Sequence, residues 1–388
     1  MEHNTLADDL LSEIQGESLQ SLLTSLQDEV TPLGATGIPT LDAQLTFRNP
    51  RKTSQSPLNR GDVLEIQASA SSGKSYLTYL LVIACILPQT YRSLSFPGWD
   101  KSAVVYDTEG TFDISRLHHV LRTRIHQILQ SFDLSELPEP IDECVETIAR
   151  QCLPRLFVCR PTSTFQLATS ILHFPDMHAE NELFQKSEVA LLVVDSLSSF
   201  YWNDRFTMEQ FRGQKSGASP VSNPLKYVLD ALQHVRNTIN PVMVLTNWGL
   251  NPLNKPSPDT GTLPSPFYKQ HLHLLPSLFA QDASEHGQMQ SNIPSMACDT
   301  PISNVGELMP PEAQPRPAET FDPESRLAIT HHITLQSSFP SVLNSDAIDR
   351  ALEHWEDASH VPGKCEVQGY VKTPGVSVIG RFSFTTQG

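Results

Sequence analysis

The segment of residues 61–87 constrains the fold of this chain more than any other. The apolar run of residues 61–68 is typical of a buried strand, and the apolar run of residues 74–87, which stops at Pro88, is typical of a buried helix. A Gly-Lys-Ser tripeptide stands between them at residues 73–75. The tripeptide alone is weak evidence, but a turn between a strand and a helix is where a phosphate-binding loop must lie.

The rest of the chain repeats this alternation of strand and helix. Apolar runs predict further strands at residues 102–110, 155–161 and 241–249, and one within residues 189–200 that ends at Asp195. Helical patterns are found at residues 114–132, from the end of the strand at 155–161 to about residue 173, and at residues 223–239. Strands that alternate with helices predict an α/β fold, with a mostly parallel twisted sheet covered by helices on both faces.

Composition changes divide the chain into four parts. Residues 1–30 carry leucines at helical spacing, and we expect a short helical segment there that either packs on the main domain or binds a partner. Residues 31–275 form the predicted ATP-binding core. Residues 276–322 are rich in proline and serine and predict a disordered insert, after which residues 323–388 are expected to add C-terminal edge strands that complete the core.

Composition also excludes several classes of protein. No uninterrupted apolar stretch is long enough to span a bilayer, so no membrane partner is expected. A formal net charge of −16 argues against a protein that binds nucleic acid over its whole surface, although a local basic groove or a basic partner remains open. The six cysteines form no CxxC pair, which favours reduced thiols in the cytosol or nucleus.

The predicted loop has residues that suit the binding of a nucleoside triphosphate with Mg²⁺. The N-terminus of the following helix presents unpaired N–H groups and a partial positive charge to an anion. Lys74 would reach the β- and γ-phosphates of ATP, and the Ser75 hydroxyl would bind Mg²⁺. Asp195 would bind Mg²⁺ from the end of its strand, and Glu109 could orient a water molecule. Each acid alone could equally be a helix cap or a solvated strand end.

The loop departs from the usual pattern at its first position. Ala68 stands where a glycine is normal, and an alanine that had to adopt a positive φ would cost about 1 kcal/mol. The backbone N–H groups of Ser71, Ser72 and Gly73 remain available to phosphate. We therefore predict that ATP is bound but hydrolysed slowly.

At this point a family resemblance can be stated. The runs TGIPTLDAQL (36–45), VVYDTEGTFDISRL (104–117), LLVVDSLSSFYWNDR (191–205) and VMVLTNWG (242–249) follow, in order, the motif set of the RecA-like recombinases. The chain resembles most closely a paralogue of these recombinases. The resemblance implies a RecA-like P-loop core without strand-exchange activity of its own, in a nuclear complex with other recombinase paralogues. Such a complex assists the recombinase filament at double-strand breaks and stalled replication forks.

The resemblance also assigns roles to individual residues and shows one departure. Gly73, Lys74 and Ser75 match the family's phosphate loop, while Asp195 matches its Mg²⁺ carboxylate and Glu109 its water-orienting glutamate. Active recombinases carry, after Thr-Asn, a glutamine that senses the γ-phosphate. Trp248 occupies that place here, and an indole cannot accept a hydrogen bond.

The segment after Asp195 matches the position of a recombinase DNA loop. Arg205, Arg212 and Lys215 could contact a DNA backbone there, but an exposed loop with ordinary charges is an equal interpretation, and DNA is expected to be contacted mainly through the complex. Two other functions stay open. One is a DNA-stimulated ATPase with its own recombinase activity, and the other is a scaffold subunit that binds no nucleotide.

Overall fold

The computed structural model describes residues 32–48, 56–92, 94–132, 140–180, 182, 187–212, 223–253, 266–272, 274–275, 327–337 and 365–386. The expected N-terminal helical segment at residues 1–30 and the expected disordered insert at residues 276–322 lie outside these ranges.

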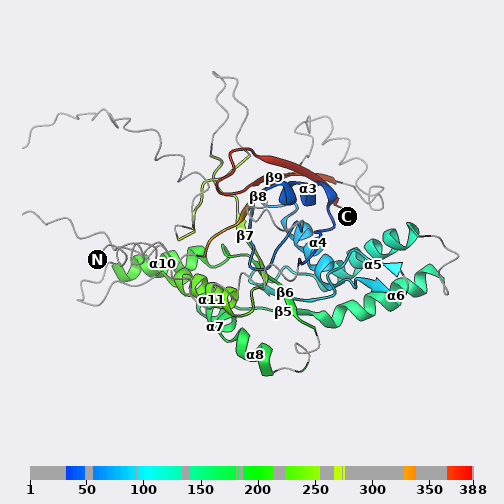
Figure 1. Cartoon of the computed structure of the whole chain (residues 1–388). Coiled ribbons are helices and arrows are strands. Elements are labelled where there is room, and N and C mark those ends of the chain that lie inside the picture. The colour runs from blue at the N-terminus through cyan, green and yellow to red at the C-terminus, as the bar shows by residue number, and fades with distance from the viewer. Residues whose placement is uncertain are drawn as a thin grey trace, which may run out of the picture.

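A single eight-stranded sheet forms the centre of the molecule (Figure 1). Its strand order is β10-β9-β8-β1-β7-β6-β4-β5. The six strands from β8 to β5 in this order run parallel, whereas β9 is antiparallel to β8 and β10 is antiparallel to β9. The strands are β1 (Val63–Ala68), β4 (Ser102–Asp107), β5 (Leu156–Cys159), β6 (Val189–Asp195), β7 (Val242–Trp248), β8 (His331–Ser337), β9 (Cys365–Lys372) and β10 (Gly380–Thr386). A separate two-stranded pair joins β2 (Thr90–Tyr91) to β3 (Leu94–Ser95).

Helices cover both faces of this sheet, as Figure 1 shows. One hydrophobic cluster joins one sheet face to α3 (Pro39–Arg48), α4 (Lys74–Ile86), α5 (Ile114–Gln130) and α6 (Ile141–Cys152). A second cluster joins the opposite face to α7 (Thr164–Leu172), α8 (Phe174–Glu180) and α11 (Pro224–Thr238), with the first turn of α10 (Tyr201–Arg212) packed against it. The predicted α/β class, with a mostly parallel sheet between two helical layers, is confirmed.

The alternation of side chains along each strand builds the two clusters. In β1, Leu64 and Ile66 join the cluster with α4, while Val63 joins the cluster with α11. All residues of β1, β4 and β6 are buried, because strands covered on both faces have no solvent side. This explains why these strands read as continuous apolar runs in the sequence.

One predicted loop is a helix. The segment after Asp195, expected to be loop, forms α10 from residue 201 to residue 212. This stretch has neither glycine nor proline. Arg205 and Glu209, which are four residues apart, form an ion pair along the helix, with Nε and Oε1 at 2.9 Å. The local sequence therefore supports a helix, and its resemblance to a family loop was the wrong guide to its conformation.

Strands β8, β9 and β10 form one side of the sheet, and β8 buries a histidine there. His331 is only 2% exposed, and its Nδ1 lies 2.9 Å from Thr373 Oγ1. Burial, together with repulsion from His332 and Arg48, lowers the pKa of His331 to about 4. The folded protein therefore holds this imidazole neutral at neutral pH.

This burial predicts a loss of stability in mild acid. The unfolded chain binds a proton at His331 near pH 6.5, but the folded chain resists it until about pH 4. The free energy of unfolding should therefore be intact above pH 6.5 and fall by up to about 3 kcal/mol as the pH drops to 4. Urea unfolding of the wild type and of His331→Gln at several pH values tests this. The free energy of unfolding should fall less steeply with decreasing pH in His331→Gln than in the wild type. It should fall as in the wild type in the control His234→Gln, which removes an exposed histidine. The same pH dependence in all three proteins would contradict the prediction.

Candidate nucleotide-binding site

The proposed site lies where parallel strands end together. Ala68, the last residue of β1, is opposite Trp248 at the end of β7, and Asp107 of β4 is opposite Asp195 of β6. Because the carboxyl ends of parallel strands meet at one edge of a sheet, the residues that follow them surround a common cleft. The loop of residues 69–73 follows Ala68 directly and leads into α4.

The backbone of this loop has the form that an anion site requires. Gly73 precedes α4 with φ 90° and ψ 9°, in the left-handed region, and no side chain caps the first turn of the helix. The uncapped N–H groups of α4 are thus left for another acceptor. Ser71 also has a positive φ, 58°, whereas Ala68 continues the extended strand. The alanine at the first loop position therefore carries no positive-φ penalty.

Lys74 folds back onto its own loop. Its Nζ donates hydrogen bonds to the carbonyl oxygens of Ala68 and Ser69, both at 2.8 Å. Burial lowers the pKa of Lys74, and the nearby carboxylates of Glu109 and Asp195 partly oppose this shift. The ammonium group is therefore held at the mouth of the loop, beside the two predicted acidic residues.

Asp195 is buried at the end of β6. Thr246 Oγ1 donates a hydrogen bond to Asp195 Oδ1 at 2.5 Å. Burial raises the pKa of Asp195, and Glu109 and Asp107 add to the rise, while the Thr246 hydrogen bond and Lys74 oppose it. A carboxylate that is desolvated in this way is stabilised by a nearby cation, so its environment suits a Mg²⁺ ligand.

Glu109 follows β4 and is exposed in the same cleft. Its Oε1 accepts two hydrogen bonds, from Ser196 Oγ at 2.7 Å and from the Trp248 indole Nε1 at 2.6 Å. Trp248, which stands where the recombinases that the chain resembles carry glutamine, thus lies against Glu109, the residue predicted to orient water. The sequence showed the substitution but not this contact.

These residues line a cleft of about 660 Å³. The cleft brings together all of the predicted site residues, namely Glu109, Ser71, Ser72, Gly73, Lys74, Ser75 and Asp195. It also contains residues that the sequence did not single out: Arg116 from α5, and Cys365, Val367 and Thr386 from β9 and β10. The strand residues could not be found from local patterns, because only the sheet order brings them to the loop.

The donor set of the cleft fits Mg-ATP. The open N-terminus of α4 and the ammonium of Lys74 suit a triphosphate, and the hydroxyl of Ser75 with the carboxylate of Asp195 are oxygen ligands of the kind that Mg²⁺ takes. The glycine at position 73 also keeps the cradle tight, since a Cβ there would lie 2.9 Å from Val367 Cγ2.

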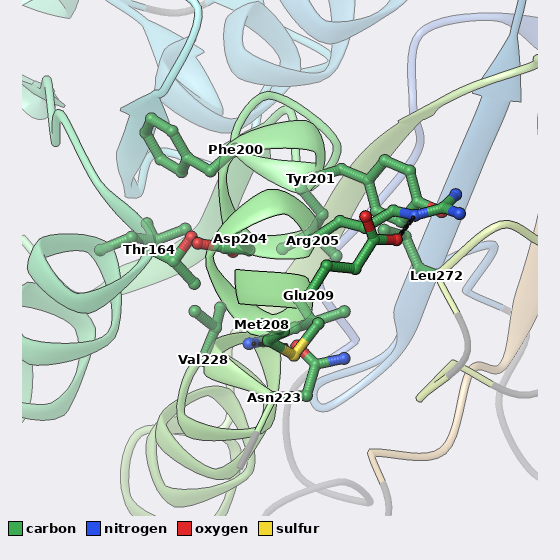
Figure 2. Close-up of a pocket in the computed structure, with 13 residues that line it drawn as sticks. Thr164, Phe200, Tyr201, Asp204, Arg205, Met208, Glu209, Asn223, Val228 and Leu272 are labelled. Carbon is green, nitrogen blue, oxygen red and sulfur yellow. Dashed lines mark hydrogen bonds and ion pairs between the residues drawn. The ribbon is translucent and has the colours of Figure 1, made fainter. Parts of the chain in front are cut away.

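Arg205 and Arg212, two of the three residues predicted to contact DNA, lie elsewhere, on α10. Arg205 lines a second cavity, of about 300 Å³, between α7, α10 and α11 (Figure 2). Its guanidinium pairs with Glu209 and lies 5.8 Å from the centre of the Trp202 ring. Thr164 donates a hydrogen bond to Asp204 at 2.6 Å on the other side of the cavity. The Arg212 side chain and Lys215 lie outside the described residues, so direct DNA contact stays a prediction.

The described part of the chain contains no group of three or more histidine, cysteine or acidic residues that could bind a metal ion. None of its helices has the length and apolar character that a membrane span requires.

The tight packing of Gly73 predicts a specific cost of substitution. Gly73→Ala must place a side chain at positive φ, which costs about 1–2 kcal/mol, and must also displace Val367. Gly375→Ala is a matched control, because Gly375 has φ 78° but nothing within 4 Å of the added Cβ. Urea unfolding should show a larger loss of stability for Gly73→Ala than for Gly375→Ala. An equal loss would mean that β9 does not press on the loop.

The chain is similar to two curated DNA repair proteins. It is 33% identical over 145 residues to the mouse protein named DNA repair protein XRCC2, an alignment that covers 37% of this chain and 43% of the mouse protein. It is 27% identical over 170 residues to an Arabidopsis thaliana protein named DNA repair protein XRCC2 homolog, covering 39% of this chain and 44% of that protein. The chain thus spans less than half the length of these relatives. No family model matches the sequence. The predicted resemblance to a recombinase paralogue is nevertheless confirmed, since the chain is XRCC2-like in sequence and similar to proteins of DNA repair.

Proposed function

We propose that this protein is an ATP-binding accessory subunit of a complex of recombinase paralogues in the nucleus. The complex would act in homologous recombination repair of DNA double-strand breaks and at stalled replication forks. The observation that carries the proposal is the convergence of the loop before α4, Lys74 and Asp195 on one cleft. The similarity to XRCC2 proteins supports the repair role.

The residues of the cleft would divide the work of binding Mg-ATP. Backbone N–H groups of Ser71, Ser72 and Gly73 would bind phosphate oxygens, and Lys74 would exchange its two loop carbonyls for the β- and γ-phosphates. Ser75 and Asp195 would hold Mg²⁺, whose charge would offset that of the triphosphate. Glu109 would be the residue that orients water.

ATP would act mainly as a structural ligand. Val367 of β9 packs against the loop at Gly73, and Cys365 and Thr386 line the same cleft, so a bound nucleotide would contact both the loop and the C-terminal strands. A ligand that binds only the folded state stabilises it by mass action. Nucleotide would therefore keep the C-terminal strands docked on the core.

The surface around α10 suits a protein partner. Trp202 and Phe206 on α10 are 54% and 62% exposed, and Phe165 of α7 lies 5.8 Å from Tyr227 of α11 between ring centres, both rings being exposed. Aromatic side chains are enriched in protein interfaces. The net charge of −16 would favour partners that are more basic.

One alternative function has an observation in its favour. A DNA-stimulated ATPase with its own recombinase activity would need a carboxylate to orient water, and Glu109 is in the cleft. Trp248 opposes this alternative, because it replaces the glutamine that couples ATP to DNA in active members of the family. DNA-stimulated hydrolysis or strand exchange by the isolated protein would support it.

Isothermal titration calorimetry should show binding of Mg-ATP to the wild-type protein. Lys74→Ala should weaken the affinity by about tenfold or more, since it removes a charge-assisted contact to phosphate. Lys226→Ala, which removes an exposed lysine of α11 away from the cleft, is the matched control and should bind as the wild type does. A wild-type protein that binds no Mg-ATP would instead support the nucleotide-free scaffold.

Complex formation should depend on the same site. Affinity purification of the tagged wild-type chain from nuclear extract should recover other recombinase paralogues, and Lys74→Ala should recover less of them because the C-terminal strands lose a stabilising ligand. Arg150→Ala, which removes an exposed cation of α6 on the sheet face opposite α11, serves as control here. Equal recovery with all three proteins would separate partner binding from nucleotide binding.

A further inference from the structure

Trp248 is fixed beside the phosphate loop by its backbone. Its N–H donates a hydrogen bond to Ser198 Oγ at 3.0 Å, and the next N–H, of Gly249, donates to the carbonyl oxygen of Ala68 at 2.8 Å. Parallel pairing also sets Trp248 opposite Ala68. The indole therefore extends from a rigid strand end, so its position is set by the sheet.

From that position the indole donates a hydrogen bond to Glu109, the carboxylate that is proposed to orient water for hydrolysis. Trp248 Nε1 donates to Glu109 Oε1 at 2.6 Å, and Ser196 Oγ donates to the same oxygen at 2.7 Å. A carboxylate oxygen offers about two acceptor positions, so this one is filled. While both hydrogen bonds persist, Glu109 Oε1 has no free position at which to accept a hydrogen bond or a proton from water.

We propose that Trp248 is a positioning residue that holds Glu109 in a resting arrangement and thereby slows the hydrolysis of ATP without weakening its binding. The inference rests on the proposed nucleotide site and gives a cause for the slow turnover that the sequence predicts. The groups expected to bind phosphate and Mg²⁺, Lys74 and Asp195, make their own hydrogen bonds to loop carbonyls and to Thr246. None of these bonds involves the indole, so binding and turnover are separable.

Steady-state kinetics of Trp248→Phe tests this proposal. Phenylalanine keeps an aromatic ring at the strand end but removes the N–H donor. The kcat for ATP should rise about tenfold, the effect expected for loss of one charge-assisted hydrogen bond, while KM stays within about twofold. Trp202→Phe, on the exposed face of α10, should leave both constants unchanged. The gain should vanish in the double variant Trp248→Phe, Glu109→Gln, because it acts through Glu109.

NMR spectroscopy without nucleotide tests the hydrogen bond between Trp248 and Glu109 directly. In protein labelled with ¹⁵N-tryptophan, the indole N–H signal that disappears in Trp248→Phe belongs to Trp248. Glu109→Gln should shift this signal, because a carboxylate acceptor is replaced by a neutral amide. The Trp99 indole bonds the Ala35 carbonyl oxygen at 2.8 Å, so its signal should not move. A Trp248 signal that ignores the Glu109 substitution would overturn the proposal.

The kinetic outcomes separate this inference from the function on which it rests. Normal Mg-ATP binding with an unchanged or lower kcat in Trp248→Phe would reject the resting arrangement alone. A wild-type protein that binds no Mg-ATP in calorimetry would reject both the proposed nucleotide site and the proposed role of Trp248. A raised kcat with KM preserved, lost again without Glu109, is the result that supports it.

Discussion

The parallel register of the central strands is the constraint on which the site depends. Pairing of β1 with β7 and of β4 with β6 places Ala68 opposite Trp248 and Asp107 opposite Asp195. In a parallel sheet these ends share one edge, so a loop, a carboxylate and an indole from distant parts of the chain meet there. A shift of one residue in any of these strands would turn its side chains to the other face and dismantle the cleft.

A buried polar cluster centred on Glu65 helps to hold that register. Glu65 is 1% exposed, and its Oε1 accepts hydrogen bonds from Asn247 Nδ2 at 2.5 Å and Gln270 Nε2 at 2.6 Å, while its Oε2 lies 2.6 Å from His332 Nδ1. The cluster thus joins β1 to both of its neighbours, β7 and β8. Because an unpaired buried carboxylate is costly, arrangements that separate these strands are disfavoured.

Much of this arrangement could be predicted from the sequence, and the limits are physical. The apolar run that ends in Asp195 and the strand-to-helix turn at Lys74 are local signals, since buried parallel strands read as continuous apolar runs. The contact of Trp248 with Glu109 joins residues 139 positions apart, and Val367 reaches Gly73 only through the sheet order. No local periodicity encodes such pairs. At α10 the helical propensity was present in the sequence, but the family comparison suggested a loop.

A structure of the protein with Mg²⁺ and a non-hydrolysable ATP analogue would test the central claim most directly. The account predicts the triphosphate at the N-terminus of α4, with Lys74 released from the carbonyl oxygens of Ala68 and Ser69 and with Mg²⁺ near Ser75 and Asp195. A nucleotide bound elsewhere, or a cleft that stays empty at saturating analogue with Lys74 still on its loop, would contradict it.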